Sequence, residues 1–208
     1  MIKLVGTSHI SPKSIERIEE ELEEEPDCVA VEIDEGRYRA LKAGESGSYP
    51  SLFFKILSWL QKKLSEKTGV LPGEEMLFAT ERAIEKNIKV YLIDRPIHIT
   101  VRRFDDVGIS EKLKLVFFSI GKMRGQKFDL KDVPPYKIIE RSIEIMKRAA
   151  PRMYSILVEE RDDIMTKALL DLERDHENIL AVVGAGHIPG IKRRLQERDV
   201  DFLDKTFK

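Results

Sequence analysis

Short apolar segments alternate with amphipathic segments along most of the chain. Four segments rich in Val, Ile and Leu have the length and composition of buried strands. Between them, apolar residues recur at helical spacing, as in the stretches from Ser14 to Glu24 and from Pro72 to Asn87. This alternation predicts an α/β fold with a mainly parallel central sheet flanked by helices. The predicted strands are Ile2 to Gly6, Cys28 to Ile33, Lys89 to Ile93 and Ile179 to Gly184, with Asp199 to Leu203 as an edge strand.

The length of 208 residues suits one sizeable core better than two. We therefore predict a single domain over residues 1–208. Two stretches, residues 43–73 and 105–150, do not follow the alternation and are predicted to be helical insertions or a cap. The first stretch contains an apolar segment, residues 52–64, around Trp59. We expect this segment to be a helix that packs against the cap or forms a homodimer contact, with a membrane-surface contact as the alternative.

Composition limits the classes of partner. The 36 basic and 37 acidic residues nearly cancel, so no overall field favours nucleic acid. No signal peptide opens the chain, and no apolar stretch approaches the ~20 residues that span a bilayer, so a cytoplasmic protein without a membrane span is expected. The single cysteine, Cys28, lies in an apolar run and is given no catalytic role. A charged share of 35%, rich in Glu and Lys, is typical of proteins from thermophiles.

Polar residues follow each of the four main predicted strands. His9 follows the first strand, Glu32 and Asp34 close the second, Asp94 and Arg95 close the third, and His187 follows the fourth. The carboxyl ends of parallel strands meet at one edge of a sheet, where ligands of open α/β sheets bind. The sequence therefore predicts one polar site at this edge, which would take a peptide or a small molecule.

His9 and His187 share a Gly-x-x-His pattern, and Glu32 lies between them in the order of the strands. Imidazole and carboxylate groups suit Mn, Co, Fe or Zn, with water at open positions. The alternative is that these are loop histidines bonded to the backbone and that Glu32 or Asp34 forms a plain ion pair with an arginine. His98 and His176 lack this context.

An arginine lies on the apolar stripe of the helix that Pro151 is predicted to open. Arg161 is three or four residues from Leu157, Val158 and Met165. Burial of an arginine requires an anionic partner, so we expect a carboxylate from Glu32, Asp34 or Asp94 to bind it. The other charged candidates near this site are Arg37, Glu160 and Asp162.

The last predicted strand also has a minor alternative interpretation as a dinucleotide fingerprint. Gly184, Gly186 and Gly190 are followed by an acidic residue at Asp201 or Asp204. Pro189 occupies the position that helix packing usually reserves for the third glycine. A phosphate could still bind at the start of the following helix.

Several blocks of the chain, taken in order, resemble the TraB family, which also includes PrgY proteins. The similarity covers nearly the whole chain and is specific in combination. The blocks are Leu4 to Ser11, Val29 to Arg37, Gly69 to Met76, Leu92 to Ile97 with Arg103, Glu160 to Asp162, and Val183 to Gly190.

The resemblance implies a metal site, because TraB proteins are grouped with the Tiki proteases. In those enzymes paired Gly-x-x-His motifs and a glutamate bind a divalent metal, usually Mn or Co, for peptide hydrolysis. By this likeness His9, Glu32 and His187 are ligand candidates, and Arg161 is a site arginine. PrgY-like members are instead linked to inhibition of a peptide pheromone, so the family does not by itself imply catalysis.

Two functions follow from these residues and from the resemblance. The first is a metal-dependent hydrolase directed at peptides, in which Glu32 is a ligand or general base and Arg161 or Arg95 faces the oxyanion. Mn or Co is expected, with Zn as a further candidate. The second is a regulatory module that binds a peptide or small ligand without turnover. Asp34, Arg37, Asp94, Glu160 and Asp162 are predicted to contact the ligand in either case.

Overall fold

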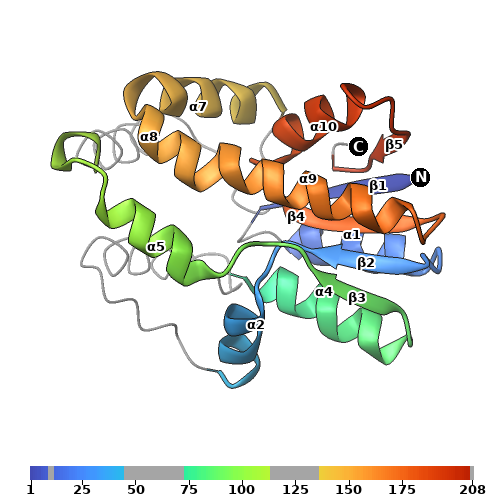
Figure 1. The fold of residues 1–208 in the computed structure, drawn as a ribbon. Coiled ribbons are helices and arrows are strands. Elements are labelled where there is room, and N and C mark those ends of the chain that lie inside the picture. Colours follow the sequence, from blue (N-terminus) through green and yellow to red (C-terminus); the bar gives the residue numbers. More distant parts are fainter. Residues whose placement is uncertain (9–11, 45–72, 113–135, 207–208) are drawn as a thin grey trace.

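The computed structural model describes residues 1–8, 12–44, 73–112 and 136–206 (Figure 1). Its sheet has five parallel strands in the order β3-β2-β4-β1-β5. This confirms the predicted α/β class, and every predicted strand is present with bounds shifted by up to three residues. The strands are β1 (Ile2–Thr7), β2 (Cys28–Val31), β3 (Lys89–Leu92), β4 (Ile179–Gly184) and β5 (Phe202–Asp204).

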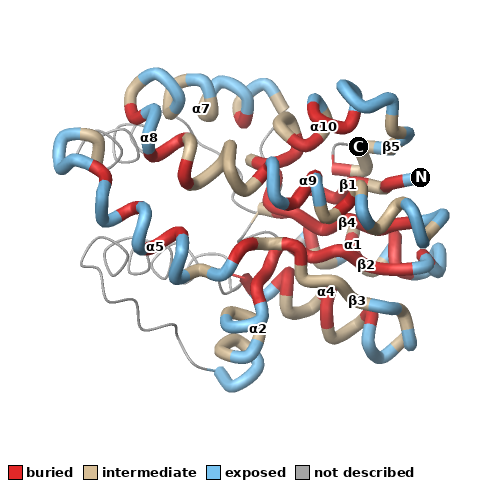
Figure 2. The backbone as a smooth tube through the Cα atoms, in the orientation of Figure 1, coloured by how far each residue is buried: buried red, intermediate tan, exposed pale blue. Residues whose placement is uncertain are grey.

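Helices cover both faces of the sheet, and side chains alternate between the faces along each strand. On one face, Val5 and Val182 pack against α1 (Pro12–Leu22) and α4 (Glu74–Glu85). On the other face, Leu4, Ala181 and their neighbours pack against α9 (Glu160–Glu173) and α10 (Ile188–Gln196). Burial is concentrated in the strands and in the inward sides of these helices (Figure 2). This double coverage explains why the strands are almost continuously apolar.

Cys28 belongs to this core, on the face covered by α9 and α10. Burial raises the pKa of its thiol to about 11. The thiol therefore stays protonated at neutral pH, in keeping with a packing role.

The remaining described helices extend the domain beyond the carboxyl ends of the strands, at the end of the sheet opposite to the amino terminus (Figure 1). A small apolar core that includes Phe104, Met153 and Ile156 joins three of them. Pro151 opens a helix, as predicted, but one turn of that helix has π-helical hydrogen bonding, which was not predicted. These helices are α2 (Glu35–Lys42), α5 (Ile97–Asp105), α7 (Tyr136–Ala149), α8 (Pro151–Tyr154) and the π-helical turn η1 (Ser155–Glu159).

The two predicted insertions are only partly covered by the described residues. In the second stretch, α7 occupies residues 136–149, whereas residues 113–135 lie outside the described part. Most of the first stretch, with Trp59, also lies outside it, so its helix and its contacts stay predictions. Within the described ranges, no helix is long and apolar enough to cross a membrane.

The connections between strands diverge at the carboxyl edge of the sheet. The chain leaving β1 and β2 passes toward the face of α1 and α4, whereas the chain leaving β4, which lies between them, passes to α10 on the opposite face. Adjacent loops that diverge in this way leave room for side chains and ligands. The residues that follow β2 and β4 therefore meet at this edge.

Candidate functional site

Glu32 lies directly after β2 and points toward the face covered by α9. Its backbone N–H continues the ladder to the Val182 oxygen, at 2.9 Å, and its side chain is only 4% exposed. Oε2 accepts a hydrogen bond from the backbone N–H of Gly184, at 2.5 Å. A carboxylate in this buried position requires further compensation.

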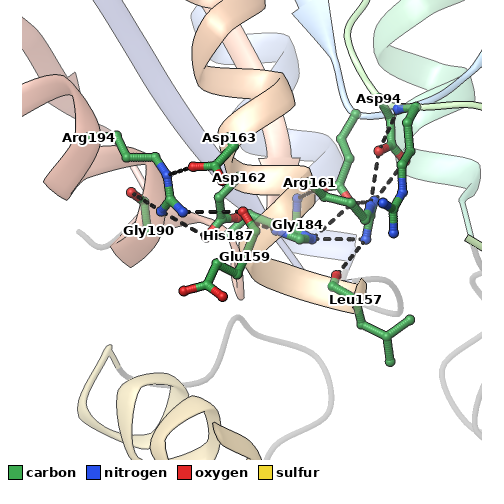
Figure 3. Close-up of polar contacts among 12 residues, drawn as sticks. Asp94, Leu157, Glu159, Arg161, Asp162, Asp163, Gly184, His187, Gly190 and Arg194 are labelled. Atoms are coloured by element: carbon green, nitrogen blue, oxygen red, sulfur yellow. Dashed lines mark hydrogen bonds and ion pairs between the residues drawn. The ribbon is translucent and has the colours of Figure 1, made fainter. Parts of the chain in front are cut away.

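Arg161 supplies most of that compensation from the first turn of α9 (Figure 3). One guanidinium nitrogen, Nη2, donates to Glu32 Oε1 and, at 2.8 Å, to Asp94 Oδ2. Nε donates to Asp94 Oδ1 at 3.0 Å, so Asp94 is bound at two points. Burial alone lowers the pKa of Arg161, but the charges of Glu32 and Asp94 outweigh burial and raise it. The predicted pairing of a largely buried Arg161 with carboxylates is thus confirmed, with its side chain 14% exposed.

Asp94 follows β3 and forms ion pairs with arginines from two helices. Besides Arg161, it contacts Arg37 of α2, whose Nη1 lies 3.4 Å from Asp94 Oδ2. Asp34 instead caps the start of α2, because its Oδ1 accepts from the N–H groups of Gly36, at 3.0 Å, and Arg37, at 3.3 Å. Of these three ligand-contact candidates, Asp94 and Arg37 join the cluster around Arg161 and Asp34 is a helix cap.

His187 begins α10 and completes the cluster (Figure 3). Its Nδ1 lies 2.6 Å from Asp162 Oδ1, and its Nε2 lies 3.3 Å from Glu32 Oε1. Arg161 Nη1 is also 3.0 Å from Nε2. His187, Glu32, Asp94 and Arg161 therefore meet at one edge, as predicted, whereas His9 lies outside the described residues.

The neighbours of His187 act on its charge in opposite directions. Burial lowers the pKa of the imidazole and Arg161 lowers it further, but Glu32 and the hydrogen bond to Asp162 raise it, to about 9 on balance. Burial also raises the pKa of Asp162, against the lowering effect of His187 and Arg194. The ring thus lies between carboxylates on both of its nitrogens, a setting that stabilises positive charge there.

The guanidinium of Arg95 binds residues outside this cluster. Its Nε donates to Thr100 at 2.8 Å, its Nη1 pairs with Glu160 at 2.6 Å, and its Nη2 donates to the backbone oxygen of Ile156. Glu160 also pairs with Arg103, at 2.8 Å. Arg95 and Glu160 therefore fasten α5 to the π-helical turn, instead of facing Glu32 and His187.

One residue near the cluster, Arg194, was not predicted from the sequence, and another, Gly190, was considered only as part of a dinucleotide fingerprint. Arg194 of α10 is 8% exposed and contacts Asp162 and Asp163, and Gly190 packs directly against the Asp162 carboxylate. The signal for Arg194 was its spacing, since it lies three residues after Ile191 and one before Leu195, on the buried side of the helix. Gly190, the last glycine of the supposed dinucleotide fingerprint, is explained by this contact with Asp162.

The donor set at Nε2 can be compared with the needs of a metal ion. Ligand atoms on one ion at metal–ligand distances of about 2.1 Å lie roughly 3 Å apart, close to the spacing of Glu32 Oε1 and His187 Nε2. Asp162 at Nδ1 is the kind of carboxylate that orients a metal-bound imidazole. These two ligands fit a divalent ion. The described residues contain no group of three such ligands, so His9 stays the predicted third.

A cavity of about 410 Å³ lies beside this cluster, between α7, α10 and the helix of Tyr154 and Val158. Asp162 and Gly186 line it, and Gly186 directly precedes His187. A Cβ on Gly186 would meet no atom of the described residues within 4 Å, so there is space beside the turn at this position. The cavity is large enough for a small ligand or part of a peptide.

The fold and the cluster together define a class: an α/β domain whose parallel sheet carries a buried charged site at its carboxyl edge. The model of the TraB/PrgY/gumN family matches residues 1–201, and the chain belongs to this family. A protein of Methanocaldococcus jannaschii described as uncharacterized is 34% identical over 98% of this chain and 56% of its own length. TraB domain-containing proteins of Bos taurus and Homo sapiens are 27% identical over 92% of this chain and 62% of theirs. The chain thus spans about three fifths of the length of these relatives.

Proposed function

We propose that this protein is a metal-dependent hydrolase that acts on peptides, with Glu32 and His187 as metal ligands. The observation that carries the proposal is the position of His187 between two carboxylates. Asp162 holds Nδ1 at 2.6 Å, while Nε2 faces Glu32 Oε1 at 3.3 Å. A carboxylate behind a histidine, with a second carboxylate in front of it, is typical of metal sites that use mixed nitrogen and oxygen ligands. Mn or Co is the proposed metal, with Zn as the alternative.

Each residue of the cluster would have a separate task in hydrolysis. A bound divalent ion polarises a carbonyl and lowers the pKa of a water molecule. Asp162 orients the His187 ring, and Glu32 either binds the metal or accepts a proton from the water. Arg161 would keep its position through the bonds of Nε and Nη2 to Asp94. Its Nη donors that contact Glu32 and His187 would turn to negative charge on the substrate.

The cavity beside Asp162 supports a peptide as the substrate. Tyr136, Tyr154 and Val158 give it apolar and aromatic walls, and Glu140, Lys192 and Arg193 add charges of both signs. Side chains and backbone of a peptide present both kinds of surface. We propose that a peptide residue next to the scissile bond occupies this cavity.

The second candidate function is a regulatory module that binds a peptide without cleaving it. The contacts of Arg161 favour this candidate, because its guanidinium already satisfies Glu32 and Asp94 and contacts His187 Nε2. A cluster whose charges are balanced by arginine needs no metal for stability. The two functions therefore differ in metal content and in product formation.

Elemental analysis of protein purified without added metal tests the proposal directly. We expect about one divalent ion per chain, and we expect His187→Ala and His9→Ala each to weaken metal binding strongly because too few ligands remain. His98→Ala is the matched control, since His98 is exposed on α5 and should leave metal binding unchanged.

Cleavage is then measured by mass spectrometry on a mixture of peptides, with and without a chelator. Metal-dependent cleavage that is lost in His187→Ala supports the hydrolase. A wild-type protein with no bound metal, and with no thermal stabilisation by Mn, Co or Zn, overturns it. Peptide binding without cleavage in the same mixture would identify the regulatory module.

A further inference from the structure

Arg194 is a buried arginine that contacts the carboxylates of Asp162 and Asp163 and two backbone oxygens. It comes from the last turns of α10, and its three guanidinium nitrogens are occupied (Figure 3). Nε donates to Asp163 at 2.5 Å, Nη1 donates to the backbone oxygen of Gly190 at 3.0 Å, and Nη2 donates to that of Glu159 at 3.2 Å. These bonds tie α10 to the junction of the π-helical turn and α9, and they fix the guanidinium in one position.

The guanidinium held in this way faces Asp162. Arg194 Nη1 lies 3.5 Å from Asp162 Oδ2, while Asp162 Oδ1 contacts His187 Nδ1 at 2.6 Å. Asp162 is 1% exposed, and its Oδ2 has no hydrogen-bond partner among the described residues. The charge of Arg194 is therefore the compensation on that side of a carboxylate that water does not reach.

Gly190 leaves the space that the Asp162 carboxylate fills. A Cβ at position 190 would lie 1.8 Å from Asp162 Oδ2 and 3.1 Å from Arg194 Nη1. Any side chain there would push the carboxylate off its position. The backbone of Gly190 has no positive φ, so close packing, and not a special turn, requires the glycine.

We propose that Arg194, with Gly190, is a positioning residue that acts on the candidate metal site through Asp162 and His187. Arg194 holds Asp162 in place, Asp162 orients the imidazole through Nδ1, and Nε2 is thereby directed toward Glu32. The metal-binding part of this proposal rests on the proposed function, whereas the chain of contacts from Arg194 to His187 does not depend on it.

The test compares Arg194→Lys and Gly190→Ala with the matched control Arg174→Lys, at the end of α9, whose side chain is 79% exposed. Lysine keeps the charge of Arg194 but cannot donate to Asp163, Gly190 and Glu159 at once. We expect Mn binding, measured by calorimetry, to weaken about 10-fold or more in both test variants, as is typical when the partner of a metal-bound histidine is disturbed. Arg174→Lys should bind Mn like the wild type.

A double-mutant cycle shows whether the effect passes through Asp162. In an Asp162→Asn background, Arg194→Lys should cause little further loss of Mn affinity. Equal losses in the two backgrounds would overturn the proposal, because Arg194 would then act on the fold in general.

A second readout needs no metal. The Nδ1 proton of His187, held by a buried carboxylate, should give a far-downfield proton resonance, identified by its absence in His187→Gln. Arg194→Lys should shift or broaden this resonance, and Arg174→Lys should not. If the wild type binds no metal, the hydrolase proposal fails, but a shifted resonance still supports the positioning role. An unchanged resonance in Arg194→Lys overturns that role in either case.

Discussion

Removal of the Arg161 charge is the perturbation with the largest expected cost. Arg161→Met would leave Glu32 and Asp94, each with a 4% exposed side chain, without their main cation. Breaking one partner out of a buried ion pair costs about 3–5 kcal/mol. The Gly184 N–H would still donate to Glu32, and Arg37 would still pair with Asp94. We therefore expect a loss in the free energy of unfolding at the lower end of this range, about 3 kcal/mol.

The measurement is urea unfolding, followed by circular dichroism, together with a thermal melt. For a chain of this size a loss of about 3 kcal/mol corresponds to a fall in Tm of about 6–12 °C. Adding Glu32→Gln and Asp94→Asn to Arg161→Met should recover part of the loss, because neutral amides cost less to bury than carboxylates. As the control, Arg39→Met removes the exposed pair with Glu35 and should cost only about 0.5 kcal/mol. A cost for Arg161→Met as small as that of the control would refute this account of the cluster.

Two further predictions concern the other half of the cluster. Gly190→Ala should lower the free energy of unfolding by about 1–3 kcal/mol in urea, because the added methyl group overlaps Asp162. Gly186→Ala is the control and should be nearly neutral, since a Cβ there meets no described atom within 4 Å. Equal effects of the two changes would contradict the packing argument. In the absence of added metal, the raised pKa of His187 should make the free energy of unfolding fall as pH rises from about 6.5, the unfolded value, through about 9. His187→Gln should flatten this pH dependence. A free energy of unfolding that increases over this range in the wild type, but not in the variant, would show that the pKa of His187 is lowered by folding.

The fold was predictable because its strands are buried on both faces. A strand such as Ile179–Gly184, with six buried residues, can be recognised as an apolar run from its own sequence, without knowing which strands and helices pack against it. The convergence of Glu32, Asp94 and His187 then followed from the parallel arrangement alone. Arg161 was found because its charge interrupts an apolar stripe at helical spacing.

Other parts of the site depend on contacts between segments that are distant in the chain. Arg95 follows β3, just as Asp94 does, but the π-helical turn presents the Ile156 oxygen and turns Arg95 away from the cluster. No local pattern marked this turn in advance, although such turns are frequent near functional sites. Arg194 lies in a run of three basic residues, a pattern that usually indicates an exposed helix face. Only its position around the helix relative to Ile191 and Leu195 places it on the buried side.

Arg161 connects the observed cluster with either proposed function. A metal ion bound by Glu32 and His187 would need the two atoms, Oε1 and Nε2, that Arg161 now contacts. Asp94 binds the same guanidinium through Nε and Nη2. Arg161 could therefore release Glu32 Oε1 and His187 Nε2 and still stay bound to Asp94. Its freed donors would then be available to negative charge on a bound molecule, the developing oxyanion for a hydrolase or a ligand carboxylate for a binding module. Under either proposal the charge that balances Glu32 and Asp94 would also recognise an anionic group, and Asp94 is the residue that would make the two roles compatible.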